Sequence, residues 1–434
     1  MAITIIDDVR ASTQVTCSAP LRILATGSTA KMLSTVTARE SLDQLISIGG
    51  AGSWPPKASF VDTWPTSLRP YHHVYNSLAH LIPAEKSSLD DDENTTRIQH
   101  LRASLLSELQ TNVDLAAVRE TVNDPDCMRP SGWMGFFACM AHMRHAYRWG
   151  VSPVVRVAQH ETSLDFPEHM DIPWFALQRR FDTTSPGGNL TSNIYYNFNE
   201  RQELEYSFTV GLSETHGRSE HWNATLFEEM ERRALPVYHL MVEAIESIGA
   251  ENSAKTLLAL KSANSHVKAI FKYFFDHLTD ANVSKALWMA YVQGPHGWAL
   301  GGIDGVSGGQ SLVIRTLDSF LGIRPFPTPE IESLHLPRSE RTWLETLRKY
   351  DIREVAKLSN YAEVEAELET MVKHLRIWRM GHMRRMVDYE GVPRPERQNM
   401  TAGKSLVATE IAPDENAMII HLKKELTVRL MQTK

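Results

Sequence analysis

Apolar residues recur along most of this chain at spacings of three and four positions, the period that gathers them on one face of an α-helix. In residues 97–112, for example, Ile98, Leu101 and Leu105 fall on the same face. The other segments that follow this pattern most clearly are 133–149, 222–247, 254–278 and 361–389. Alternating patterns typical of β-strands are short and few. The pattern therefore predicts an all-α fold, a class that builds its sites between helices.

The helical pattern is interrupted in two places, which suggests how the chain is divided. Residues 1–66 are rich in Ser, Thr, Gly and Pro, so we interpret them as an N-terminal extension that is at best partly ordered. Between residues 150 and 200 the pattern weakens, and prolines and the run Ser-Pro-Gly-Gly-Asn break it. We therefore predict a small helical domain with its connecting segment over 67–199 and a larger helical domain over 200–434.

Composition and charge exclude some classes of function. Hydrophobic residues make up 42% of the 434 positions, enough for a sizeable core, and the formal net charge is −7. An acidic balance gives no electrostatic reason to expect nucleic acid or an anionic membrane surface as a partner. No apolar stretch approaches the roughly 20 residues that span a bilayer. The three cysteines are widely spaced, which suits a reducing compartment. We expect a cytoplasmic protein with no membrane partner, and we favour a monomer.

Candidate chemistry is concentrated in the predicted helix 361–389. Its apolar stripe runs through Leu375 and Trp378, and the next position at the same spacing is His382, with Arg379 three residues earlier. One interpretation is a buried, hydrogen-bonded histidine beside an arginine whose stem lies along apolar surface. The other is a haem ligand, because haem iron commonly takes one imidazole from a helix that lines an apolar cavity. An arginine fork suits a haem propionate.

A glycine-rich run precedes another apolar helix pattern. Five glycines stand in the nine positions from Gly301 to Gly309, and the segment after Ser311 places Asp318 among apolar residues. Glycine lets the backbone approach a flat ligand closely, and a buried aspartate needs a partner. A flexible surface loop followed by a capped helix explains the same pattern. A phosphate-binding P-loop does not, because the glycine spacing is wrong and the lysine is missing.

Two runs of sequence resemble a known family. GVSGGQSLVIRTLDSFLGI resembles the glycine-rich segment and following helix of the indoleamine 2,3-dioxygenases, which are histidine-ligated haem dioxygenases. VKHLRIWRMGHMRRMVDY resembles their proximal-histidine helix, in which an arginine stands three residues before the histidine. The two runs occur in the family's order. VYNSLAHLIPAE and WGVSPVVRVAQ add fainter similarity, so the resemblance covers about residues 70–434.

The resemblance implies a small and a large helical domain that enclose haem b, with O2 as co-substrate. It makes His382 the proximal ligand of the haem iron. Arg379 and Asp318 become the pair on the propionate side, with Asp318 fixing the arginine. Gly308 and Gly309 lie against the cofactor.

The resemblance also implies positions for a distal pocket, where O2 and an indole-type aromatic substrate meet. His160 and Ser307 are the candidate catalytic residues. His160 could donate a hydrogen bond to substrate or oxygen, or it could be a surface residue. The implied substrate-binding positions are Tyr206, Phe208 and Ser213 in a distal helix, Met289 in the segment 286–291, and Thr401 in a loop that closes over the substrate.

The chain departs from the family's pattern in two places. The segment 286–291 lacks the arginine that binds a substrate carboxylate in the family, and Met289 is the nearest match. A Gly-Thr-Gly-Gly-Thr pattern is expected in the substrate loop, where Met400–Lys404 stands instead. A free amino acid would lose a charged hydrogen bond typically worth about 1.5–3 kcal/mol. The departures predict an indole or tryptophan-derived substrate other than free tryptophan.

The function predicted from the sequence is a haem-dependent dioxygenase that inserts O2 into the C2–C3 bond of its substrate. One alternative is a monooxygenase or ring-rearranging enzyme of specialised metabolism on the same scaffold. Another is a haem-binding or purely helical interaction protein without turnover. Cofactor content separates this last case from the enzymes, and the number of oxygen atoms gained by the product separates the two enzymes.

Overall fold

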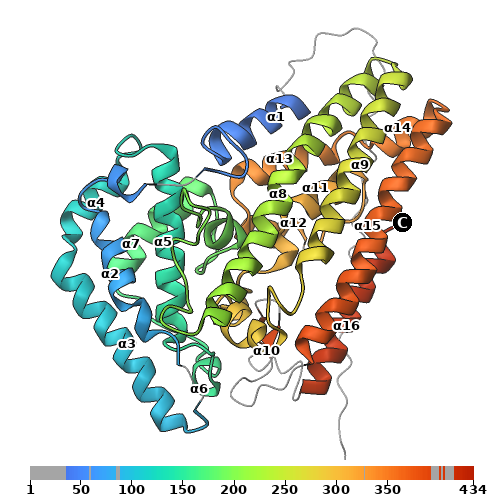
Figure 1. Ribbon diagram of the computed structural model, residues 1–434. Helices are drawn as coiled ribbons and strands as arrows, with labels where there is room; N and C mark the ends of the chain where they lie inside the picture. The colour runs from blue at the N-terminus through green and yellow to red at the C-terminus, as the bar shows by residue number, and fades with distance from the viewer. Residues whose placement is uncertain are drawn as a thin grey trace, which may run out of the picture. The chain divides into compact units, whose positions relative to one another are not determined.

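The chain is described here by a computed structural model over residues 36–57, 60–84, 88–326, 328–391, 400–401, 404–405 and 415–434. Residues 1–35, the first part of the predicted extension, lie outside the described residues. Helices make up most of the described chain (Figure 1). Within it the only strands are β1 (Met400–Thr401) and β2 (Lys404–Ser405), which pair antiparallel. The predicted all-α class is confirmed, whereas the proposed boundary at residue 199 stays a prediction.

The segments with the clearest apolar periodicity all form helices. They are α3 (Asp91–Asn112), α5 (Pro130–Trp149), α8 (Glu214–Gly249), α9 (Ser253–His277) and α15 (Ala362–Glu390). The shorter α-helices are α1 (Ala38–Gln44), α2 (Arg69–Leu78), α4 (Leu115–Asn123), α6 (Arg156–Gln159), α7 (Glu168–Phe181), α10 (Lys285–Leu287), α11 (Leu312–Phe320), α12 (Pro329–His335), α13 (Arg338–Arg348), α14 (Ile352–Leu358) and α16 (Glu415–Gln432). Short 3-10 or π-helical turns are η1 (Leu45–Gly49), η2 (Val61–Thr63), η3 (Ala79–Leu81), η4 (Thr191–Tyr195), η5 (Trp288–Gln293), η6 (Leu300–Gly302) and η7 (Gly308–Gln310).

Local sequence explains where these helices begin and end. Asp90 caps α3, because its carboxylate accepts hydrogen bonds from the backbone of the first turn. Pro130 occupies the first turn of α5, where its missing N–H costs nothing. Gly150 ends α5 in the left-handed conformation, with a φ of 70°. Caps and stops of this kind set the boundaries, and the buried apolar stripes set which face of each helix turns inward.

The helices that carry the candidate chemistry form a layer in which α8, α9, α15 and α16 lie side by side (Figure 1). Phe271 and Phe274 of α9 pack on the indole of Trp378 in α15, with ring centroids 5.4 and 5.5 Å apart. Gly381 permits this approach, since a Cβ there would lie 2.6 Å from Cζ of Phe275. The position of α15 is therefore fixed by aromatic packing on α9.

One of the groups that join the segment around Trp54 to the core is a buried carboxylate. Glu231 of α8 accepts a hydrogen bond of 2.8 Å from the indole N–H of Trp54 and one of 3.0 Å from the backbone N–H of Val313 in α11. The hydroxyl of Tyr238 donates to the same carboxylate. Burial raises the pKa of Glu231 to about 7. This single group connects the α1 region, α8 and the first turn of α11.

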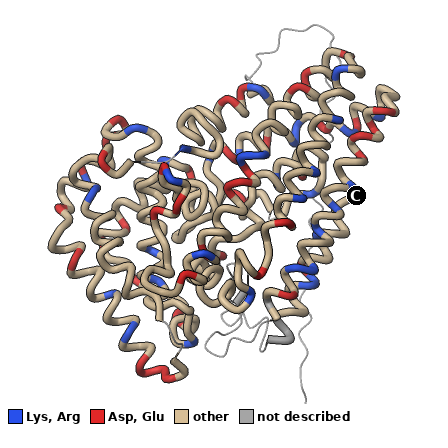
Figure 2. The backbone as a smooth tube through the Cα atoms, viewed as in Figure 1, with Lys and Arg blue, Asp and Glu red and all other residues tan. Residues whose placement is uncertain are grey.

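Charged residues are distributed over the outside of the fold. Figure 2 shows acidic and basic residues interspersed along the helices, as in an ordinary globular surface. A search of the described residues finds no helix that combines the length and apolarity needed to cross a membrane.

Three histidines lie buried together where α5 meets the loop before η6. His145 donates from Nδ1 to the carbonyl of Pro295, 2.9 Å away, and its Nε2 accepts from the N–H of Gly188. The ring centroid of His296 lies 6.0 Å from that of His142. Burial lowers the pKa of His142 to about 4 and that of His145 to about 3, so both are neutral at pH 7.

This burial predicts a pH-dependent contribution to stability. The pKa of His142 is about 4 in the folded protein, against 6.5 for an ordinary histidine. Below pH 6.5 the unfolded chain binds a proton that the folded chain does not, so this contribution is present above pH 6.5 and is lost as the pH falls toward 4. Relative to His142→Gln, the wild type should lose about 2 kcal/mol between pH 7.5 and 5, as measured by urea unfolding.

The exposed His100 provides the control for this experiment, since His100→Gln should leave the pH dependence of the wild type unchanged. A stability difference between the wild type and His142→Gln that stays constant from pH 7.5 to 5 would contradict the prediction.

Candidate functional site

The second half of α15 presents the predicted histidine beside a row of aromatic rings. The imidazole of His382 stacks on Trp378 with ring centroids 5.0 Å apart and an interplanar angle of 13°. The ring of Phe274 comes from the neighbouring helix α9, and its centroid lies 6.0 Å from that of His382. These contacts follow from the stripe on α15, in which Val364, Leu368, Met371 and Leu375 are buried. The rings give the imidazole a fixed, apolar surrounding.

His382 is in the state that a metal ligand requires. Burial, with a smaller contribution from Arg379, lowers the pKa of its imidazole to about 4, so the ring is neutral at pH 7. The side chain is half-buried, and among the described residues no hydrogen bond reaches either ring nitrogen. Haem iron commonly takes a single histidine from the protein, because the porphyrin supplies four of its ligands. A neutral, unbonded imidazole on an apolar wall fits that requirement.

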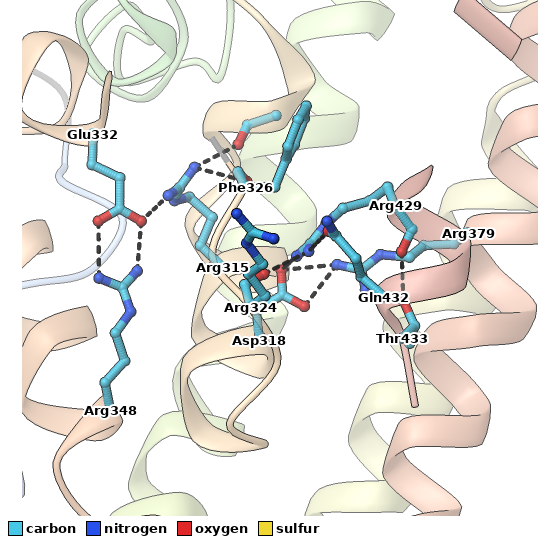
Figure 3. A network of polar contacts seen from close by, with 11 residues as sticks. Arg315, Asp318, Arg324, Phe326, Glu332, Arg348, Arg379, Arg429, Gln432 and Thr433 are labelled. Carbon is cyan, nitrogen blue, oxygen red and sulfur yellow. Dashed lines mark hydrogen bonds and ion pairs between the residues drawn. The ribbon is translucent and has the colours of Figure 1, made fainter. Parts of the chain in front are cut away.

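Arg379 and Asp318 form a buried ion pair that joins α15 to α11. One guanidinium nitrogen of Arg379 donates to both carboxylate oxygens of Asp318, at 2.7 and 2.8 Å (Figure 3). Both side chains are about 5% exposed. Arg429 of α16 donates to the same carboxylate, and the hydroxyl of Thr433 accepts from Arg379. The two residues that the resemblance pairs are thus in contact, and their role toward a haem stays a prediction.

The network continues from this pair toward the glycine-rich segment. Arg315, one turn before Asp318 on α11, donates to the carbonyl of Gly309 at 3.0 Å and to the carboxylate of Glu332. Arg348 donates to Glu332 as well (Figure 3). Burial lowers the pKa of Arg315 to about 9. The glycine-rich segment and α15 are therefore held by the same polar network through α11.

The glycine-rich segment forms a tight 3-10 turn at the surface. The hydroxyl of Ser307 accepts from the N–H of Gly309 at 3.2 Å, which caps η7. Gly308 lies against α8, since a Cβ there would be 3.4 Å from Cζ of Phe227. Gly308 and Gly309 are exposed and Ser307 is half-buried. The turn thus offers bare backbone and one hydroxyl to a ligand.

The short π-helical turn η5 bridges α8 and α15 beside this turn. Met289 lies within it and is 1% exposed. Trp288 donates from its indole N–H to Asn223 of α8, 3.1 Å away, and its ring lies 5.6 Å from that of Tyr389 in α15. Thr401 lies in β1. The structure therefore places Met289 near the predicted proximal helix, and its role toward a substrate stays a prediction.

The prediction that Tyr206, Phe208 and Ser213 lie in a distal helix is wrong. They lie in a loop that ends at Ser213, the residue before the first turn of α8. The carboxylate of Glu220 in α8 accepts hydrogen bonds from the backbone N–H groups of Phe208 and Thr209. These bonds hold the loop against the start of α8 in a non-helical conformation.

The same loop packs away from His382. Tyr206 and Phe208 are buried against α2 and α5, where the Tyr206 hydroxyl lies 3.0 Å from Nδ1 of His72 and Phe208 stacks on His142. Their role in substrate binding stays a prediction. Among the described residues, no contact of these two side chains with His382 supports it.

His160 is exposed and stands at the end of α6. No hydrogen bond or ring contact among the described residues links His160 with His382. The surface interpretation of His160 agrees with this placement.

Two residues of the polar network were missed by the sequence analysis, Arg429 in α16 and Thr433 just after the end of that helix. They continue a helical stripe from Leu422, and all three are buried. An arginine on an apolar stripe was the available signal, and it is the same signal that singled out Arg379.

Comparison with known proteins adds one finding. The sequence model of the family described as "Indoleamine 2,3-dioxygenase" matches residues 128–425, which is more than half of the 434 residues. The matched range contains His382, Arg379, Asp318 and the glycine-rich run, and it ends before Arg429. A search of curated proteins finds no match.

The shared carboxylate predicts a large stability effect. Asp318→Asn removes the charge that pairs with two buried guanidinium groups, so the apoprotein should lose about 3–5 kcal/mol of unfolding free energy. Urea unfolding measures this loss. Glu369→Gln is a matched control, because its ion pair with Arg353 is largely exposed and should be worth less than about 1 kcal/mol. Equal losses in the two variants would show that burial of the Asp318 network does not determine its contribution.

Proposed function

Because the chain belongs to the indoleamine 2,3-dioxygenase family, whose members are haem-dependent dioxygenases of tryptophan- and indole-type substrates, we propose that it is a haem b enzyme acting on an indole or tryptophan-derived compound other than free tryptophan. It would insert O2 into the C2–C3 bond of that substrate. The observation that carries the proposal is the neutral imidazole of His382 on α15, one turn from the Arg379–Asp318 pair.

The residues that would hold the cofactor differ in what they contribute. His382 would bind the iron, and the stacked Trp378 fixes the plane of its ring. Arg379, oriented by Asp318, would meet a propionate. Gly308 and Gly309 would let backbone approach the porphyrin. When bound, the haem supplies the iron that activates O2, while the protein supplies position and a dry surrounding.

The protein groups nearest the reacting atoms must orient the substrate and exclude water. Ser307 is the candidate for a polar contact, because its oxygen accepts from Gly309 while its own proton stays available to a substrate or oxygen. The rings of Phe274 and Trp378 would help to exclude water around His382. A low-dielectric surrounding strengthens each of the few polar contacts that remain.

The expected substrate follows from the residues of η5. From Trp288 to Gln293 this turn carries no basic side chain, and Met289 within it is buried and apolar. An arginine–carboxylate pair there would contribute about 1.5–3 kcal/mol to binding. A substrate without a free carboxylate loses no binding free energy when this arginine is absent. An indole with a neutral carboxyl group, or with none, is therefore the better match.

The cofactor assignment is tested by haem titration of wild type and His382→Ala. The wild type should bind one haem with the absorption spectrum of a histidine-ligated ferrous–CO complex, and the variant should lose that spectrum because no other imidazole replaces the ligand. His374→Ala, eight residues earlier on the same helix, is the control and should keep the wild-type spectrum. A wild type that takes up no haem, or an unchanged spectrum in His382→Ala, would overturn the proposal.

The substrate assignment is tested by comparing tryptophan with tryptophan amide, which differs only in the carboxyl group. We expect the amide to be turned over with a kcat/KM at least equal to that of tryptophan, since η5 has no cation for the carboxylate. A preference of about 10-fold or more for tryptophan would contradict this expectation.

Turnover under isotopically labelled O2 tests the reaction type. Incorporation of both oxygen atoms supports ring cleavage. Incorporation of one would replace the dioxygenase assignment by a monooxygenase.

A further inference from the structure

Two arginines share one carboxylate at the junction of α11, α15 and α16. Asp318 accepts two hydrogen bonds from Arg379 and one from Arg429, and these three side chains are less than 10% exposed (Figure 3). Among the described residues, this pairing sets two guanidinium groups against one carboxylate. Isolated buried charge is costly, and an anion that reaches this point would balance it.

Among the described residues, the neighbouring ion pairs follow the same pattern. Arg315 and Arg348 share Glu332 in the same way, with one carboxylate for two guanidinium groups. Both halves of the network in Figure 3 are thus biased toward positive charge, and they are joined through α11. A dicarboxylate ligand would match this pattern better than a neutral ligand would.

The end of α16 holds Arg379 in a fixed orientation. The hydroxyl of Thr433 accepts from Arg379 and donates to the carbonyl of Arg429, 3.0 Å away. Arg429 in turn donates to the carbonyl of Arg324 at 2.7 Å and to the side chain of Gln432 at 3.1 Å. Each guanidinium is therefore positioned from two helices, and neither can turn away without breaking several charged hydrogen bonds.

We propose that Arg429 is a second arginine of the cofactor site, which holds Arg379 through the shared Asp318 and supplies the positive charge that balances a haem propionate. The inference rests on the proposed haem function. It goes beyond the family pattern, because Arg429 and Thr433 lie after the matched range 128–425. It makes α16 part of the cofactor site.

The experiment compares haem with haem dimethyl ester, in which both propionates are uncharged. Dissociation constants are measured by absorption titration for wild type and Arg429→Gln. We expect Arg429→Gln to weaken haem binding by about 10-fold, the effect of one charged contact, and to change the affinity for the dimethyl ester by less than about 2-fold. Arg429→Lys should restore part of the affinity for haem and leave the ester unaffected.

Matched variants separate charge from structure. Arg233→Gln removes an exposed guanidinium that pairs with Glu229 in α8, outside the Asp318 network, so it should bind both ligands as the wild type does. His382→Ala should weaken both ligands alike, because it acts on the iron. Urea unfolding of each apoprotein shows that the variants fold.

The outcomes have distinct meanings. Equal weakening of haem and ester by Arg429→Gln would assign the residue a structural role and overturn the inference, as would no weakening of either. A wild type that binds neither ligand would instead overturn the proposed function itself.

Discussion

The carboxylate of Asp318 is where three helices from distant parts of the chain are joined. It lies on α11, and its partners Arg379 and Arg429 come from α15 and α16. Each of these groups is removed from water, so each is stable only while the others stay in place. Mutual dependence of this kind specifies a single register between helices, because a shift of one turn would leave a buried charge without a partner.

The geometry of the candidate iron ligand depends on this junction. Arg379 and His382 are separated by three residues on α15, so a helix fixed at Arg379 also fixes the direction of His382. The aromatic contacts of Trp378 with α9 set the same stretch from the other side. The imidazole is thus oriented by an ion pair on one flank and by stacked rings on the other, and the two constraints involve different neighbouring helices.

The sequence was most informative where a single periodicity runs for many residues. The stripe that ends in His382 predicted both the long helix α15 and the side of it that meets the core, and the resemblance named Asp318 as the partner of Arg379 before the contact was seen. Prediction failed at Tyr206 and Phe208, whose loop is shaped by a carboxylate twelve to fourteen residues away. Local patterns carry no information about such a contact.

Arg429 shows a related limit of sequence analysis. Its helical position was readable, but its partner stands 111 residues away in the sequence. Only the packing of α16 on α15 brings the two together. Long-range pairing of charges becomes visible once the arrangement of helices is known.

The carboxylate of Glu231 gives the chain before α2 an influence at a distance. It binds the indole of Trp54 with one oxygen and the first turn of α11 with the other. The packing of the segment around Trp54 and the position of α11 are therefore coupled through this carboxylate. Because such a coupling is reciprocal, each contact favours the other. Loss of the Trp54 contact would leave a buried carboxylate with fewer donors, and that carboxylate is the group that accepts from the first turn of α11.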